Sequence, residues 1–174
     1  RGGRVIDPAS GLDATCDVGF ADGRVAAVAP RIAEQAHVER DVAGAIVTPG
    51  MIDLHTHVYW GGTSIGVEAE PIARRSGTTT FIDAGTAGPA NFPGFRRHVI
   101  EPSPVRILAY LNVSFAGIFA FSRTVMVGES SDLRLLDLSE CVRVARENRD
   151  LIVGIKVRVG RGAGGTSGVA PLDM

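Results

Sequence analysis

The sequence has few of the features that identify a secreted, membrane or nucleic-acid-binding protein. Its 174 residues include only two cysteines, Cys16 and Cys141, which do not form a C-x-x-C pair. Neither a disulfide framework nor a zinc knuckle is therefore expected, and a reducing, cytoplasmic location fits best. The formal net charge is −1, and the 18 basic and 19 acidic residues are scattered along the chain. This pattern gives no electrostatic case for a nucleic-acid or anionic-membrane partner.

Long hydrophobic runs are also absent. The longest apolar stretch, from Ile107 to Phe121, contains polar residues and glycine and is shorter than the ~20 residues that a membrane helix needs. The N-terminus shows no pattern of a cleaved leader. Hydrophobic residues nevertheless make up 45% of the chain, enough for the core of about one globular unit. Because the chain opens on Arg1 and stops at Met174, where a new segment begins, both ends are expected to be cut.

The pattern of the chain changes near Gly50. Residues 1–48 are expected to form the N-terminal part of a small antiparallel β-sandwich module, with short β-type runs at 17–21, 25–29 and 38–42 and a hairpin turn at Asp22-Gly23. In residues 49–174, strand-like segments at 51–58, 78–84, 106–114 and 151–159 alternate with helix-like ones. Such alternation favours βα units and a parallel sheet. The expected fold class is α/β: the β module followed by the first half of a (β/α)₈ TIM-like barrel.

Helix signals lie between these strands. Asp137 with Glu140 three residues later predicts a capped helix start, and Gly77 predicts a left-handed end to a helix over 67–75. A third helix is expected over 93–100. The glycine-rich stretch 160–168 lacks the Gly-Lys-Ser/Thr ending of a phosphate loop and is interpreted as a flexible rim loop that could act as a lid.

The most informative feature is a pair of histidines two residues apart. His55 and His57 lie at the end of the apolar run 51–58. Alternate residues of a strand share a face, so Asp53, His55 and His57 are expected on one face. In parallel α/β barrels the active site forms at the carboxyl ends of the strands. The pair is therefore predicted to clamp a metal; two hydrogen-bonded structural histidines are the alternative.

A lysine and an arginine are predicted to point into the barrel from its fourth strand. Lys156 and Arg158 alternate with apolar residues, which would face the outer helices. If the interior site lowers the pKa of Lys156, its neutral amine can react with carbon dioxide to form a carbamate. A carbamate has two oxygens and can bridge two divalent cations that acidify a shared water. The alternative is a rim lysine that is solvated or paired with a carboxylate.

These features together resemble a known family. The segment Pro49-Gly50-Met51-Ile52-Asp53-Leu54-His55-Thr56-His57, preceded by a β module and followed by the inward lysine, resembles the amidohydrolase superfamily. More narrowly, the chain is similar to the amidohydrolase/deacetylase metallohydrolases, often named dihydroorotase-like, in which a Gly-Gly pair follows the metal histidines. Segments 83–88 and 154–158 are also similar to that subgroup. The resemblance covers nearly the whole chain.

The resemblance implies a metal site that this chain completes only in part. His55 and His57 would hold the more buried of two divalent metals, and Lys156, in its carboxylated form, would bridge to the second. Zinc is the expected metal on grounds of availability, and carbon dioxide is needed for the carboxylation. Two further histidines and an aspartate general base would come from later strands, so no catalytic residue is assigned here. His37 and His98 are expected on the surface.

Five further residues receive secondary roles. Asp53 and Asp83 are candidates for orienting the metal ligands, with a plain buried hydrogen-bonding role as the alternative. Trp60, Asn112 and Arg158 are candidates for binding substrate at the rim, with packing or pairing as the alternative.

The sequence is therefore interpreted as an N-terminal part of a metal-dependent hydrolase. It would cleave amide, cyclic amide or ester bonds of a small molecule by attack of metal-bound hydroxide. Alone it is expected to be inactive, because a full barrel needs ~250 residues. One rival is a non-catalytic half barrel that serves assembly, and another is a true dihydroorotase or hydantoinase. The oligomeric state stays open, although an exposed half barrel would favour a homo-oligomer.

Overall fold

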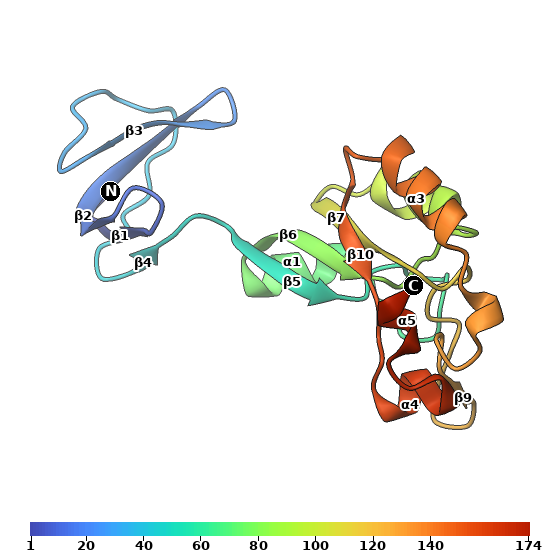
Figure 1. The fold of residues 1–174 in the computed structure, drawn as a ribbon. Coiled ribbons are helices and arrows are strands. Elements are labelled where there is room, and N and C mark those ends of the chain that lie inside the picture. Colours follow the sequence, from blue (N-terminus) through green and yellow to red (C-terminus); the bar gives the residue numbers. More distant parts are fainter. The chain divides into compact units, whose positions relative to one another are not determined.

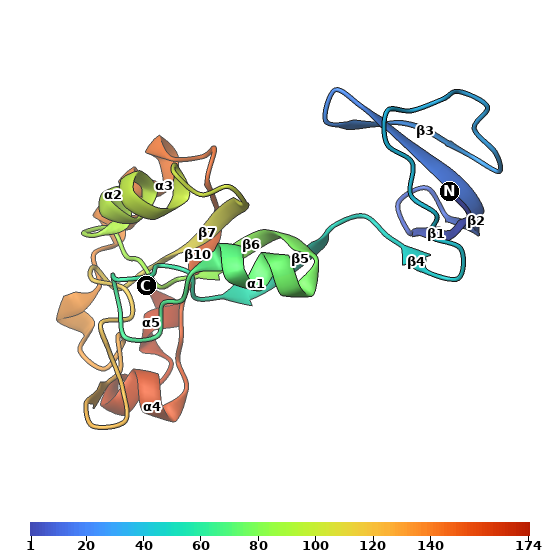
Figure 2. The same cartoon turned by 180° about the vertical axis from the view of Figure 1, so that it is seen from behind.

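A computed structural model describes every residue from Arg1 to Met174. The chain divides into two compact units, residues 1–50 and residues 51–174. Figures 1 and 2 show the secondary structure of each unit from opposite sides, and each is described by itself below. None of the helices combines the length and the apolar character needed to cross a bilayer.

The first unit is a four-stranded sheet in the order β3-β2-β1-β4. Its strands are β1 (Gly3–Asp7), β2 (Leu12–Ala21), β3 (Arg24–Ala29) and β4 (Ile46–Val47). The predicted hairpin turn is confirmed, since Asp22 and Gly23 have φ values of 52° and 71° and Ala21 pairs with Arg24. Two positive φ values give a turn whose twist matches that of the flanking strands.

The prediction of a strand at 38–42 is wrong. These residues pair with no strand. The strands that pair with β2 are β3 and β1, and the sequence analysis did not predict β1. Contacts with Arg1 hold the segment instead. The Arg1 carbonyl accepts from the amide of Val42 at 3.0 Å, and its guanidinium binds Asp17 and Glu39. The β-type residues at 38 and 42 therefore flank an irregular, charged segment.

The second unit is built on a parallel sheet in the order β10-β7-β6-β5. The strands are β5 (Met51–Thr56), β6 (Thr78–Ala84), β7 (Arg106–Asn112) and β10 (Ile152–Lys156). All three pairings are parallel, and neighbours in the sheet are also consecutive strands of the main repeat. The four predicted strands are confirmed, although three of them end earlier than expected. This is the α/β architecture of the first half of a (β/α)₈ barrel.

Helices connect the successive strands. α1 (Ala69–Ser76) follows β5, α2 (Phe92–Phe95) with the π-helical turn η1 (Arg96–Ile100) follows β6, and α3 (Leu138–Glu147) precedes β10. Both predicted caps are confirmed. The Asp137 carboxylate accepts from the amide of Glu140 at 3.0 Å, and Gly77 ends α1 with φ 71°. The helix expected at 93–100 is present, but its second half widens into the π turn.

Short elements lie in the long connections. The β7–α3 connection holds a hairpin of β8 (Ala120–Phe121) and β9 (Met126–Val127) and the 3₁₀ turn η2 (Leu133–Leu135). After β10 come α4 (Arg161–Gly164), η3 (Gly165–Ser167) and α5 (Ala170–Asp173). The glycine-rich stretch is thus mostly helical turns rather than the expected open loop. Close packing against α4 explains why residue 128 is a glycine, because a Cβ there would lie 2.1 Å from the carbonyl oxygen of Ala163.

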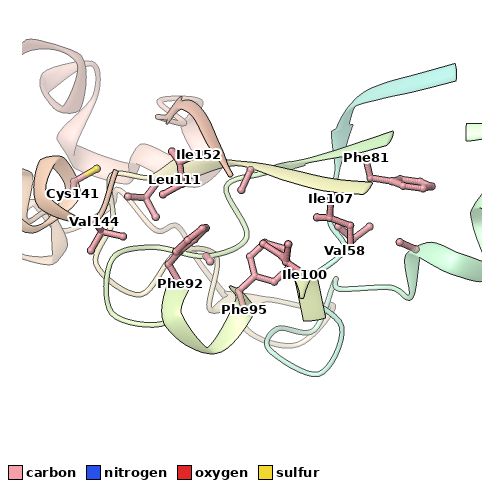
Figure 3. Close-up of a cluster of buried hydrophobic side chains, with 13 residues drawn as sticks. Val58, Phe81, Phe92, Phe95, Ile100, Ile107, Leu111, Cys141, Val144 and Ile152 are labelled. Atoms are coloured by element: carbon pink, nitrogen blue, oxygen red, sulfur yellow. The ribbon is translucent and has the colours of Figure 1, made fainter. Parts of the chain in front are cut away.

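One apolar core joins the sheet to its helices (Figure 3). Every helix that connects two main strands contributes to it, so all of these helices cover the same face of the sheet. This placement is what right-handed βαβ connections produce. The largest fully buried apolar side chains in this core are Phe81, Phe92, Phe95 and Leu111.

The two edge strands leave apolar side chains exposed. Met51, Ile52 and Leu54 of β5 are 53–60% exposed, and Val153 and Ile155 of β10 are both 49% exposed. The prediction that residues 153 and 155 face the helices holds for Ile155, which pairs with the core residue Leu111. A register irregularity between 152 and 154 breaks the alternation. The exposure marks both edges as surfaces that further structure would cover.

The core predicts the effect of one truncation. Replacing Leu111 with alanine should lower the free energy of unfolding by about 2–5 kcal/mol, because it leaves a cavity between the sheet and α3. Denaturant unfolding followed by circular dichroism measures this loss. The matched control is Leu172→Ala in α5, where the side chain belongs to a residue that is 59% exposed, and its expected change is below about 0.5 kcal/mol. Equal losses would contradict the proposed core.

Candidate metal and substrate site

The two histidines lie at the carboxyl end of β5. His55 is the penultimate residue of the strand and is exposed, whereas His57 follows the strand and is half-buried. Their ring centroids are 5.6 Å apart in an edge-to-face arrangement. Two imidazoles at this separation, at the end of the sheet where parallel barrels carry their active sites, form the centre of the candidate site.

The structure places Asp53 differently from the expectation. Between the pairs Asp53–Phe81 and Thr56–Asp83, β5 has one more residue than β6. This bulge interrupts the alternation of faces, so Asp53 falls opposite a residue of the helix-covered core rather than on the histidine face. Its exposed carboxylate accepts from the amide of His55 at 3.1 Å. Asp53 therefore supports the irregular backbone beside the histidines and does not contact their rings.

Asp83 connects the ends of β5 and β6. Its side chain is fully buried, and its two oxygens accept from the amides of Val58 at 2.8 Å and Thr86 at 2.7 Å. Val58 follows His57 directly. The carboxylate thus fixes the backbone on both sides of the candidate site, which suits the predicted orienting role.

Thr86 is a site residue that the sequence analysis missed. It is fully buried, and its Oγ1 lies 2.8 Å from Nδ1 of His57. The available signal was its position two residues after the end of β6, in the same turn as Asp83. One hydrogen-bonded ring nitrogen leaves only Nε2 of His57 for another ligand.

Burial and the nearby positive charges favour the neutral form of His57. Burial lowers its pKa to about 4, and the positive charges of His55, Lys156 and Arg158 act in the same direction. For Asp83, burial raises the pKa, while the Thr86 hydroxyl beside it acts in the opposite sense. The Thr86 hydroxyl can accept from Nδ1–H of His57 or donate to Nδ1, and the tautomer of the ring decides which. When the hydroxyl accepts, the lone pair lies on Nε2, as a metal ligand requires.

Lys156 reaches the same region from β10. It is the last residue of the strand, pairs with Asn112 of β7 and is half-buried. Its side chain lies over Gly85, where an added Cβ would stand 2.5 Å from both Cβ and Cγ of the lysine. Because Gly85 is the neighbour of Thr86, the lysine stem passes beside the group that binds His57.

Asn112 has a role different from the expected one. It is fully buried, its Nδ2 donates to the carbonyl of Gly85 at 2.8 Å and its Oδ1 accepts from the amide of Ser114 at 2.9 Å. Both ends of the carboxamide are thus used to hold the turns after β6 and β7. Substrate cannot reach this side chain without breaking those bonds.

The other two candidates for substrate binding remain accessible. Trp60 lies in the turn after His57 and is 59% exposed. Arg158 follows β10, and its Nη2 donates to Oε2 of Glu129 at 2.6 Å. Glu129, a residue that the sequence analysis did not single out, lies in the connection between β9 and η2, and its side chain is buried. His37 and His98 are exposed, as expected.

The donors that are present fit part of a metal site. No group of three or more His, Cys, Asp or Glu side chains is arranged to hold a metal ion. The chain instead brings together two imidazoles, one of them neutral with a free Nε2, and one lysine. Nitrogen ligands of this kind suit zinc and its neighbours, but a closed zinc site takes four ligands. The set is therefore chemically suitable but incomplete.

Comparison with known proteins finds relatives both by sequence and by structure. No family model matches the sequence. The chain is 41% identical over 154 residues to a deacetylase of Agrobacterium fabrum, covering 88% of this chain and 37% of that protein. It is also 41% identical over 164 residues to a deacetylase of Brucella anthropi, covering 93% and 40%. The crystal structure of a dihydroorotase superposes with a TM-score of 0.85 and 37% identity, covering 98% of this chain and 44% of the other.

The fold and the position of the site define the chain as the first half of a (β/α)₈ barrel with its candidate site at the carboxyl ends of the strands. The relatives identify which barrel: the chain belongs to the amidohydrolase superfamily. It spans about two fifths of the length of the curated relatives that it matches.

The Thr86 hydrogen bond predicts the tautomer of His57. In the wild type, Nδ1 should carry the proton at pH 7. Thr86→Val removes the hydroxyl at nearly constant volume and should shift His57 towards the Nε2–H tautomer, which ¹⁵N NMR of the imidazole resolves. Thr80→Val, on β6 and without a hydrogen bond to a histidine, is the matched control and should leave the His57 tautomer unchanged. An unchanged His57 tautomer in Thr86→Val would show that the hydroxyl does not direct the ring.

Proposed function

We propose that this chain forms the first half of the active site of a metal-dependent hydrolase that cleaves amide, cyclic amide or ester bonds of small molecules. The observation that supports the proposal is the position of His55 and His57 at the carboxyl end of β5 and of Lys156 at the carboxyl end of β10, in one parallel sheet. The similarity to two deacetylases and to a dihydroorotase supports the same reaction class.

Each residue has a defined task in this proposal. His55 and His57 would bind a divalent metal, zinc by preference, and Lys156 in its carboxylated form would hold a second one. The metal would supply a Lewis acid and acidify a water molecule. Thr86 would orient the ring of His57, and Asp83 would hold the backbone on both sides of the site. Trp60 and Arg158 would contact the substrate, and the two free, buried cysteines suit a reducing, cytoplasmic location.

The same proposal implies that the 174 residues are inactive by themselves. The site offers two imidazoles and one lysine, and the apolar edges of β5 and β10 are exposed. We infer that further strands complete both the ligand set and the barrel. A non-catalytic half barrel that associates through these edges is the alternative, and the exposed apolar side chains are the observation that favours it.

Metal content and hydrolysis test the proposal directly. The chain and a version extended through the remaining barrel strands are compared on N-acetyl and cyclic amide substrates. The extended form should bind two metals and turn over substrate, and the 174-residue chain should not. In the extended form, His57→Ala should abolish activity, whereas the matched control His98→Ala, an exposed histidine of η1, should retain it. An extended form that binds no metal would remove the hydrolase assignment and leave the assembly alternative.

Lysine carboxylation has a separate test. Lys156 is the single lysine among the 174 residues, so within them a side-chain carbamate has one place to form. In ¹³C-labelled bicarbonate with zinc present, the extended protein should show a protected carbamate resonance that is lost in Lys156→Arg. Removing the metal with a chelator should weaken the resonance, because the carbamate loses its cation. A resonance that survives in Lys156→Arg would assign the carbamate to another amine.

A further inference from the structure

The stem of Lys156 packs against the backbone of the turn that follows β6. At Gly85 an added Cβ would lie 2.5 Å from both Cβ and Cγ of the lysine, closer than two carbon atoms can approach without one of them moving. Gly85 also has a φ of 81°, in the region that residues with a side chain rarely adopt. Two separate features therefore require glycine at this position: the close lysine stem and the backbone conformation.

A buried asparagine holds this turn against the neighbouring strand. Asn112, the last residue of β7, is fully buried, and its Nδ2 donates to the carbonyl of Gly85 at 2.8 Å. Its backbone amide donates to the carbonyl of Ala87 at 2.9 Å. One residue thus binds both ends of the turn 85–87. Gly85 and Asn112 together form what we call the lysine cradle.

The pairing of β7 with β10 brings Lys156 to this cradle. Lys156 is opposite Asn112 in the parallel register, and its carbonyl accepts from the amide of Val113 at 3.0 Å. Because β7 lies between β6 and β10 in the sheet, the turn after β6 must reach across the end of β7 to touch the lysine. The hydrogen bonds of Asn112 hold the turn in that position. Three strands therefore determine where the lysine stem lies.

The same turn also contacts the histidine site. Thr86, the residue after Gly85, lies with its hydroxyl 2.8 Å from Nδ1 of His57. A lysine side chain is a flexible four-carbon stem that loses rotamer freedom when it is held in one place. Packing of its Cβ and Cγ on Gly85 restricts the inner half of that stem. The turn therefore sets the position of the lysine stem and of the His57 ring together.

We propose that Gly85 and Asn112 are positioning residues for the carboxylated form of Lys156. This inference rests on the proposed function and adds to it two residues that neither bind metal nor contact substrate. In carboxylation, the neutral Nζ forms a bond to the carbon of carbon dioxide and releases one proton to water. The cradle takes no part in that step. It determines where the two carbamate oxygens lie, because a ligand that joins two cations must be held in a precise geometry.

Filling the cradle tests this inference. In the extended protein with ¹³C-labelled bicarbonate and zinc, Gly85→Ala should displace the lysine stem and abolish the carbamate resonance. The second metal should bind about 10–100-fold more weakly, whereas the metal at His55 and His57 should be retained. Gly77→Ala is the matched control, because Gly77 has a similar φ of 71° but its added Cβ would meet only Cε of Met51, at 3.7 Å. It should keep the carbamate and both metals.

A second variant removes the asparagine side of the cradle. Asn112→Leu has a similar volume but cannot bind the carbonyl of Gly85, and it should weaken the carbamate resonance and the second metal in the same way. Asn91→Leu is the matched control. The Asn91 carboxamide also joins two turns, since it accepts from the amide of Gly88 at 2.9 Å and donates to the carbonyl of Ala116 at 3.0 Å. Thermal unfolding checks that each variant is folded at the temperature of the measurement.

The outcomes separate this inference from the proposed function. If the wild type forms the carbamate and the folded Gly85→Ala and Asn112→Leu variants keep it with both metals, the cradle is refuted while the hydrolase proposal stands. Equal losses in the Gly77→Ala and Asn91→Leu controls would also refute the cradle, because they would reflect general strain. A wild type that forms no carbamate would refute the role of Lys156 in the proposed function, and the cradle with it.

Discussion

The hydrogen bonds of the Asp83 carboxylate are the constraint on which the candidate site depends. One buried side chain accepts from the backbone that follows His57 and from the backbone of Thr86. Thr86 in turn contacts the ring of His57, and its neighbour Gly85 makes room for Lys156. The ends of β5 and β6 are thereby connected through a few short hydrogen bonds, and the side chain of Lys156 at the end of β10 packs beside them. Losing one acceptor would leave a buried N–H unpaired, at a cost of about 1–3 kcal/mol.

The sheet explains why the candidate ligands lie at one end of the strands. Parallel strands direct their carboxyl ends to one side, so every further strand of a barrel adds side chains to the same region. Here the carboxyl ends of β5 and β10 carry two imidazoles, a lysine and Arg158, and Glu129 reaches Arg158 from the connection between β9 and η2. The exposed apolar side chains of β5 and β10 and the incomplete ligand set are two consequences of the same open edges.

Much of the fold was predictable because its signals are local. The four strands, the Asp137 cap, the Gly77 helix end and the Asp22-Gly23 turn each depend on residues within a few positions of one another. The errors have non-local causes. The segment 38–42 has strand-like residues but is held by contacts with Arg1, and the face of Asp53 depends on a bulge in the pairing of β5 with β6.

The sequence by itself determined the fold class and the principal ligand candidates, because strand periodicity and the spacing of His55 and His57 are properties of the chain alone. Only the tertiary structure decided how their neighbours are used. In it, the carboxamide of Asn112 forms hydrogen bonds with backbone groups, the hydroxyl of Thr86 forms one with the ring of His57, and Arg158 pairs with Glu129. The bond of Asn112 to Ser114 is local, but the other three join residues 27 to 29 positions apart. The formation of these three depends on register and burial, which follow from packing the whole sheet rather than from any local pattern.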